Sequence, residues 1–265
     1  MTNKFKFLSI LAIMLIVPLC VLGVGCVGST KHEASTKYNH DANFHWNTCV
    51  CEKADCEEKY NIEAHTWVDG TPTNTETETT TPQMCNKCGA TNNKITRTDA
   101  QVKALFVKLC DDYFTGNRSF TFSMANALIS YNSSTQESVT ISTMDGFGSK
   151  VVKEINNYKE YDKETRTFKV VGNSSNIIAY LQQYDVLLTF KNLKDVVNAN
   201  TITVETNDGV YTISLNNGAQ DFTFEFNTER IVSFSQGNIV YTIVDTFDQA
   251  AFNAFDTTGY TLATN

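Results

Sequence analysis

The sequence predicts an α+β protein: a curved antiparallel sheet with helices on its concave face, preceded by a small Cys/His-rich module. Three observations predict this arrangement. All four histidines lie in the first 65 residues, and six of the eight cysteines lie from Cys26 to Cys88. After Asp99, apolar residues recur every three or four positions, as in a helix. Later segments alternate apolar and polar residues and are separated by Asp-Gly and Asn-Gly turns, as in antiparallel strands.

Residues 1–25 have the layout of a secretory leader. Lys4 and Lys6 precede an apolar run from Phe7 to Val24, and Gly25 is followed by Cys26. A positive segment, an apolar segment and small residues at the cleavage point are typical of an export signal. A cysteine directly after the small residues resembles the bacterial lipobox, which implies that Cys26 is lipid-modified and becomes the new N-terminus.

Two alternatives to the lipoprotein signal stay open. The lipobox normally carries leucine three residues before the cysteine, where this chain has Gly23. The leader is then either an ordinary signal peptide or an uncleaved anchor, since its apolar run approaches the roughly 18–20 residues that span a bilayer. All three interpretations place the protein outside the cytoplasm. The lipoprotein prediction adds a location at the extracytoplasmic face of the cell membrane, with the membrane as partner through Cys26.

Charge and composition argue against a nucleic-acid partner. The formal net charge is −8, and no cluster of Lys and Arg follows the leader. A protein that binds nucleic acid needs a basic patch to neutralise phosphates, so this class of function is excluded.

The chain after the leader divides into three predicted parts. The polar, small residues 26–37 are expected to form a flexible tether, and residues 38–92 a Cys/His module. Residues 97–265 are expected to form the α+β domain. Within the module, residues 71–83 (TPTNTETETTTPQ) are expected to be a solvated loop, because this composition cannot pack a core.

The module carries metal-ligand spacing. In Cys85-x-x-Cys88-Gly89, a tight turn can bring two thiolates to one tetrahedral zinc ion. Such a structural ion would close a fold too small to bury its own core. The predicted metal ligands are Cys49, Cys51, Cys56, His65, Cys85 and Cys88.

These residues resemble a repeat found in surface proteins of Gram-positive bacteria, His-Trp-x-x-Cys … His-x-Trp/Phe … Cys-x-x-Cys-Gly. The resemblance implies a degenerate zinc ribbon. This chain departs from the repeat at Cys49-Val50-Cys51, so Cys51, Cys56 or His65 is left to complete the site. The alternative is a disulfide cluster, because disulfides persist outside the cytoplasm and an even number of cysteines remains once Cys26 is lipidated.

The α+β domain is expected to open with a helix capped by Asp99. Its apolar face places Cys110 on the buried side, as a packing residue. The expected face comprises Val102, Leu105, Phe106, Leu109, Cys110 and Tyr113.

Strands are predicted where apolar and polar residues alternate, with helices between two strand sets. A helix is expected over 174–184 and a shorter one around Leu193 to Val197. The strands are expected around Phe120–Met124, Val139–Ile141, Phe168–Val170, Ile202–Val204, Tyr211–Leu215, Phe222–Phe226, Val232–Phe234 and Ile239–Ile243.

This order of elements resembles the half-barrel of the lipoprotein-carrier family (LolA/LppX-like), particularly at residues 229–241. The resemblance implies that an acyl chain is held between the sheet and the helices. A ligand cavity is then expected to be lined by phenylalanines, unless these simply form the packed core. The candidates are Phe120, Phe122, Phe222, Phe224, Phe226 and Phe234.

The sequence therefore favours a non-enzymatic binding module over an enzyme. The α+β domain contains no histidine, which excludes Ser-His-Asp and Cys-His catalysis within it. The expected partner is a hydrophobic ligand or an envelope protein. The alternative function is a structural or adhesive surface protein whose zinc- or disulfide-stabilised module serves as a spacer.

Overall fold

The computed structural model describes residues 31–51, 56–142, 146–183 and 185–264. The predicted leader and Cys26 lie outside these ranges. The chain forms two compact units. The N-terminal unit comprises the residues up to Gly70 together with Pro82–Asn92, and the C-terminal unit comprises Thr71–Thr81 and the residues from Asn93 onward. None of the helices among the described residues has the length and apolar character needed to cross a membrane.

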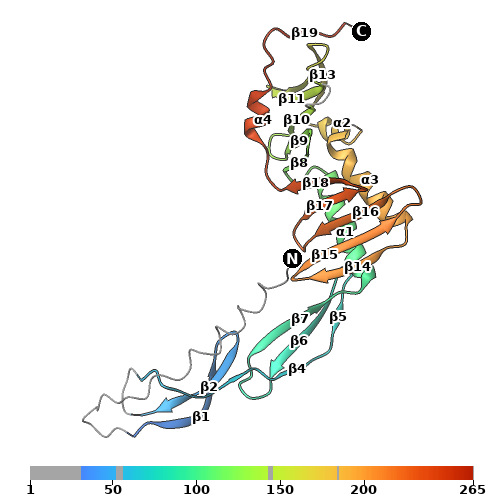
Figure 1. The fold of residues 1–265 in the computed structure, drawn as a ribbon. Coiled ribbons are helices and arrows are strands. Elements are labelled where there is room, and N and C mark those ends of the chain that lie inside the picture. The colour runs from blue at the N-terminus through green and yellow to red at the C-terminus, as the bar shows by residue number, and fades with distance from the viewer. Residues whose placement is uncertain (1–30, 52–55, 143–145, 184, 265) are drawn as a thin grey trace, which may run out of the picture. The chain divides into compact units, whose positions relative to one another are not determined.

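The first sheet of the N-terminal unit has three antiparallel strands in the order β1-β2-β3, of which Figure 1 labels the first two. These are β1 (Glu33–His40), β2 (Phe44–Val50) and β3 (Lys59–Ala64). β1 starts inside the segment 26–37 that was expected to be a tether. Its side chains are nearly all exposed, so it lacks the apolar alternation that marks a strand in sequence.

The expected loop at residues 71–83 is wrong, because this segment contains strands. A second sheet is built from β4 (Trp67–Asp69), β5 (Thr73–Asn74), β6 (Thr79–Cys85) and β7 (Thr91–Thr96). Thr73 pairs with Thr80, and the turn is closed by the Thr75 amide, which donates to the Glu78 carbonyl at 2.8 Å. Threonine is β-branched and suits strands, and this preference prevails over the polar composition.

The C-terminal unit is built on one 12-stranded sheet, which confirms the α+β, mostly antiparallel prediction. In this sheet the last long strand of the chain, which contains Ile243, pairs with the first strand, at Phe122. The pairing joins the strands that precede the intervening helices to those that follow them. The order is β14-β15-β16-β17-β18-β8-β9-β10-β11-β12-β13-β19, and only the short β19 runs parallel to its neighbour among the described pairs.

Every strand predicted in this unit is present, and four further strands accompany them. The first set is β8 (Phe120–Met124), β9 (Ala127–Asn132), β10 (Glu137–Ser142), β11 (Gly148–Glu154), β12 (Asn157–Asp162) and β13 (Thr167–Asn173). The second is β14 (Thr203–Asn207), β15 (Val210–Asn216), β16 (Asp221–Phe226), β17 (Ile231–Gln236), β18 (Ile239–Val244) and β19 (Thr261–Leu262).

The first helix, α1 (Asp99–Phe114), is capped one residue earlier than expected. Thr98 is the N-cap; its hydroxyl accepts the Gln101 N–H, and the Gln101 side chain accepts the Thr98 N–H in return. This capping box satisfies two amides that the helix leaves unpaired. As predicted, Cys110 lies on the buried face of α1 and is not exposed to solvent.

The relative lengths of the next two helices are the reverse of the prediction. α2 (Ile177–Leu181) is short, whereas α3 (Asp185–Ala199) is long. The Asn176 side chain accepts the Asn173 N–H, and the Ser175 hydroxyl donates to the Asn173 side chain. Such local bonds from Asn and Ser compete with helix formation, so the helix begins only at Ile177.

Both faces of the β9–β13 region are covered. On one face α2 and α3 pack over a large apolar core that includes Tyr131, Val151 and Tyr158 of these strands. The same core continues over β16, where Phe106 of α1 lies 5.0 Å from Phe224 and 5.1 Å from Phe226, ring centroid to ring centroid. On the other face, α4 (Gln249–Ala254) and Phe255 cover a smaller core around Val139. Figure 1 shows α2 and α4 on opposite sides of these strands.

Candidate metal centre

The N-terminal unit has an unusual interior, because polar metal-ligating groups take the place of an apolar core. Both apolar clusters of the described chain belong to the C-terminal unit. The buried residues of the N-terminal unit are His45, Trp46, Asn47, Cys85 and Ala90. His45 is 0% exposed and Cys85 is 1% exposed. A unit of this size buries too little apolar surface to be stable by itself, so another source of stability is required.

The described residues of this unit form two Cys/His clusters, each with four candidate ligand atoms within 4.8 Å of one another. The hairpin cluster consists of His45, His65, Cys85 and Cys88. The sheet-end cluster consists of His32, Cys49, Cys51 and Cys56. Either set can hold a metal ion.

The hairpin cluster joins the three-stranded sheet to the end of β6. His45 lies at the start of β2, His65 follows β3, and Cys85 ends β6. The Cys85 sulfur lies 3.8 Å from His45 Nδ1, and the Cys88 sulfur lies 3.4 Å from His65 Nδ1. Ligands at ordinary Zn–S and Zn–N lengths are separated by about 3.4–3.8 Å at the edges of a tetrahedron. These two distances are those of the edges of a tetrahedral site, and all four ligand atoms lie within 4.8 Å of one another.

In both histidines Nδ1 faces the cysteine sulfurs, and Nε2 points away from them. The surroundings of Nε2 favour metal binding through Nδ1. His65 Nε2 donates to the Asp41 carbonyl at 3.0 Å, which leaves the Nδ1 lone pair facing the sulfurs. His45 Nε2 is buried without a hydrogen bond and lies 3.9 Å from a carboxylate oxygen of Glu63, which is also ion-paired with Lys87. A carbonyl or carboxylate behind a ligating imidazole is the usual support in metal sites.

The Cys85–Gly89 turn positions backbone amides around a sulfur. Gly89 has a φ of +75°, which glycine adopts without strain, and its N–H donates to the Cys85 carbonyl at 3.0 Å. Burial acts to raise the pKa of Cys85, but the amides of Cys88 and Lys87 and the His65 imidazole outweigh it and lower the pKa to about 5. The turn is built to stabilise a thiolate, the form that binds metal.

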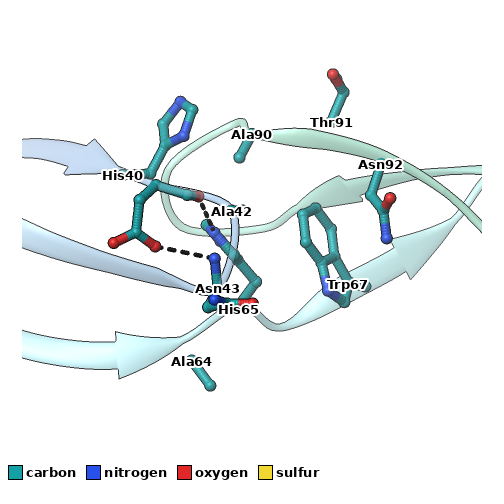
Figure 2. A pocket seen from close by; sticks show the side chains of 10 residues that line it. His40, Ala42, Asn43, Ala64, His65, Trp67, Ala90, Thr91 and Asn92 are labelled. Carbon is teal, nitrogen blue, oxygen red and sulfur yellow. Dashed lines mark hydrogen bonds between the residues drawn. The ribbon is translucent and has the colours of Figure 1, made fainter.

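A polar cleft of about 710 Å³ opens beside the hairpin cluster. Figure 2 shows His65 and Trp67 on its wall, and one dashed line marks the hydrogen bond from His65 to the Asp41 carbonyl. The Trp67 ring lies 4.6 Å from the His65 ring, centroid to centroid. His40 also lines the cleft. The cleft gives solvent, and therefore metal ions or chelators, a route to the half-buried side of the cluster.

The sheet-end cluster gathers residues from the ends of the three-stranded sheet. His32 precedes β1, Cys49 lies in β2, and Cys56 precedes β3. His32 Nδ1 is 3.3 Å from the Cys49 sulfur and 3.4 Å from the Cys56 sulfur. Burial and the neighbouring thiols of Cys56 and Cys51 raise the pKa of Cys49 to about 12. Three crowded sulfurs thus resist ionising together unless a cation accompanies them.

All six predicted metal ligands lie in these clusters, but they do not form one site. Cys49, Cys51 and Cys56 lie together in the sheet-end cluster, so none of them joins Cys85 and Cys88. Of the three residues that the sequence offered to complete the site, His65 is the one that lies beside Cys85 and Cys88. The structure adds His45 and His32. His45 was visible in the His-Trp motif. His32 was hidden because it lies in the polar segment expected to be a tether.

The described cysteines are not joined in disulfides, which favours metal binding over the disulfide alternative. These are Cys49, Cys51, Cys56, Cys85, Cys88 and Cys110.

In the C-terminal unit, three of the six predicted cavity phenylalanines line an apolar groove of about 350 Å³. Phe122, Phe222 and Phe234 are joined there by Leu193 and Val196 of α3. The other three, Phe120, Phe224 and Phe226, are at most 1% exposed. All six phenylalanines belong to the same buried core, and three of them also line the groove.

Comparison of the chain with protein-family models and with curated proteins returned no match. Because a fold alone does not define a function, the two Cys/His clusters and the apolar groove carry the functional evidence.

Proposed function

We propose that this chain is an exported, lipid-anchored, non-enzymatic binding protein. Cys26 carries the lipid and holds the protein at the extracytoplasmic face of the membrane. The N-terminal unit is a zinc-stabilised spacer, and the C-terminal unit is a half-barrel, with helices on the concave face of its sheet, that binds a small hydrophobic ligand. The single observation that carries the binding role is the apolar groove between α3 and the sheet.

Zinc is the metal that suits the hairpin cluster. Two thiolates and two imidazoles in a tetrahedral arrangement are a common structural zinc set, and a filled set of four protein ligands leaves no open position for catalysis. Soft sulfur ligands disfavour magnesium and calcium, which prefer oxygen. The ion would stabilise the N-terminal unit in place of the apolar core that its described residues lack.

The groove has the size and chemistry of a small-ligand site. Its volume of about 350 Å³ lies near the lower end of the range typical for ligand pockets. Phe122, Phe222 and Phe234 provide an apolar wall, and the polar side chains of Asn192 and Gln236 also line it. None of the described lining residues is charged. The ligand proposed is therefore a neutral amphiphile with one acyl chain and an uncharged polar head.

Displacement of a neutral hydrophobic fluorophore by a monoacylglycerol tests the groove. Val196→Trp places an indole in it and is expected to weaken monoacylglycerol binding at least about tenfold, because the acyl chain loses its space. Asn198→Trp is the matched control, since Asn198 is exposed on the same helix. A fatty-acid anion of the same chain length is expected to bind less tightly than the neutral ester.

Either of two results would reject the groove as the binding site. One is unchanged monoacylglycerol binding by Val196→Trp, with thermal unfolding like that of the parent protein. The other is the absence of saturable binding by the parent protein itself.

Fractionation of producing cells tests the anchor. The parent protein is expected in the membrane fraction and labelled by a palmitate analogue, whereas Cys26→Ala is expected to lose the label. Cys20→Ala serves as the control, because this second leader cysteine is not expected to carry lipid. Labelling that survives Cys26→Ala would contradict the proposed anchor.

One observation favours the second candidate, an adhesive surface protein. Val68 and Met84 are paired across β4 and β6 and are 53% and 56% exposed. An exposed apolar pair of this kind suits contact with another protein. This candidate predicts that Val68→Ser with Met84→Ser weakens attachment to an envelope protein while monoacylglycerol binding stays unchanged.

A further inference from the structure

We infer that the sheet-end cluster is a second zinc site, which exchanges its ion while the hairpin cluster retains its own. It involves residues that the proposed stabilising site does not use. The protein would then carry one structural zinc and one exchangeable zinc. The exchangeable site is formed by His32, Cys49, Cys51 and Cys56.

The ligand set is complete and compact. His32 Nδ1 lies within 3.3–3.4 Å of the Cys49 and Cys56 sulfurs, near the roughly 3.6 Å expected for an N···S edge of a tetrahedral zinc site. Cys49 and Cys51 are two residues apart in sequence, so an extended backbone directs both side chains to the same side. Three thiolates and one imidazole select a thiophilic divalent ion such as zinc.

The two clusters are too far apart to share one ion. His45 and Cys49 are both in β2, four positions apart. At about 3.3 Å per residue, their backbone positions are roughly 13 Å apart. The sites are therefore separated along the strand, with the buried residues Trp46 and Asn47 between them in sequence. Occupation of both therefore requires two zinc ions.

Exposure distinguishes the two sites. In the hairpin cluster, His45 and Cys85 are buried and the other two residues are half-buried, whereas all four residues of the sheet-end cluster are half-buried. The Glu58 carboxylate, which accepts from the Tyr60 hydroxyl at 2.7 Å, lies 3.4 Å from His32 Nδ1. It offers an alternative oxygen ligand when His32 leaves. Solvent access and an alternative ligand are the conditions for exchange by stepwise ligand replacement.

The two sites differ in their number of thiolates. A zinc ion with three thiolates and one imidazole has a net charge of −1, whereas a zinc ion with two thiolates and two imidazoles is neutral. Cobalt(II) in place of zinc reports the number of thiolates, because its thiolate-to-cobalt charge-transfer absorbance rises with each thiolate bound. The sheet-end site should give the stronger absorbance per ion.

The test uses the chain without its leader, purified under reducing conditions, with zinc counted by a colorimetric chelator. The parent protein is expected to hold two zinc ions and to release them in two phases, the faster one from the sheet-end cluster. Cys56→Ser is expected to hold one and to lack the fast phase. Cys110→Ser, which changes a buried cysteine outside both clusters, is expected to keep both ions and both phases.

Three outcomes would overturn the proposal. The first is a parent protein that binds a single zinc retained by Cys56→Ser. The second is an unchanged fast phase in that variant. The third is cobalt absorbance in the parent protein equal to that of two identical two-thiolate sites, a readout that does not depend on whether the variant folds. A parent protein with one zinc and a Cys56→Ser variant with none would instead support the sheet-end site and reject the stabilising zinc of the hairpin cluster.

Discussion

His65 Nε2 donates to the backbone carbonyl of Asp41 at 3.0 Å, and the Asp41 carboxylate in turn accepts the amides of Asn43 and Phe44. One residue thus fixes both the β1–β2 turn and the tautomer of a candidate metal ligand. The two amides lower the pKa of Asp41, so the carboxylate that holds the turn stays ionised at neutral pH. Asp41, which is far from Cys88 in sequence, thereby orients the His65 ring so that Nδ1 faces the Cys88 sulfur.

Asp41→Ala is expected to weaken zinc binding to the hairpin cluster by about tenfold, the lower end of the effect of groups behind metal ligands. The cause is loss of the turn that presents the Asp41 carbonyl to His65. Competition with a chromophoric chelator measures the change. Asp41→Asn keeps an oxygen acceptor for Asn43 and Phe44 and should bind zinc almost as the parent does. Equal weakening in both variants would contradict this role of the turn.

Cys110 is expected to remain a thiol in the native protein and to take no part in metal binding. It is fully buried in α1, and burial raises its pKa. Cys110→Ser places a hydroxyl in apolar surroundings and should lower the unfolding free energy of the C-terminal unit by about 1–3 kcal/mol. Chemical denaturation checks the cost, and Cys110→Ala, which buries no hydroxyl, should cost less. Native alkylation of Cys110 at the rate of an exposed thiol would refute the assignment.

Arg97 is expected to hold the 71–81 hairpin within the C-terminal unit. Its side chain is 10% exposed, and its guanidinium is ion-paired with Glu78 and donates to the Tyr211 hydroxyl at 2.8 Å. Arg97→Leu should destabilise this unit by about 1–3 kcal/mol, because partners that are partly buried lose a charged hydrogen bond. Hydrogen exchange of the Thr73–Thr80 amides should accelerate in parallel. A double-mutant cycle with Glu78→Gln should give a coupling of about 1 kcal/mol or more, and additive effects would contradict the pairing.

Glu154 is expected to contribute to acid sensitivity. The Lys159 ammonium and the Tyr161 hydroxyl lower the pKa of Glu154 below its ordinary value of 4.5. The folded state therefore favours the charged form, and this stabilisation is complete above 4.5 and disappears as the pH falls through the lowered pKa. Glu154→Gln should thus be less stable at neutral pH and lose less stability between about pH 5 and about pH 3. Glu164→Gln, in an exposed turn, should keep the parent's pH profile, and an unchanged profile in Glu154→Gln would refute the prediction.

The sequence predicted the elements whose signals are local. The α1 face and the strand Asp221–Phe226 follow from apolar spacing alone, because the buried side of each repeats with the period of its element. Pairing of Ile243 with Phe122 could not be predicted, since it depends on contacts between residues far apart in sequence. β1 was missed because its side chains are exposed on both faces, which leaves no alternation.

The sequence identified which residues could bind metal, but not how they group into two clusters. Cysteine spacing identifies Cys85 and Cys88 as a pair, because the turn between them is short and local. Assignment of His45 to that pair depends on how β2 and the β6–β7 hairpin meet, which no local pattern encodes. The sequence also could not separate the three phenylalanines that line the groove from the other three candidates, because all six follow the same alternation of apolar and polar residues.

Native mass spectrometry of the leaderless chain, purified without reductant, tests the central claim, that metal takes the place of an apolar core in the N-terminal unit. The predicted mass is that of the polypeptide with two bound zinc ions, and removal of both by a chelator should unfold the N-terminal unit. A zinc-free mass lowered by two hydrogens for each disulfide, in a protein that stays folded with chelator, would contradict it.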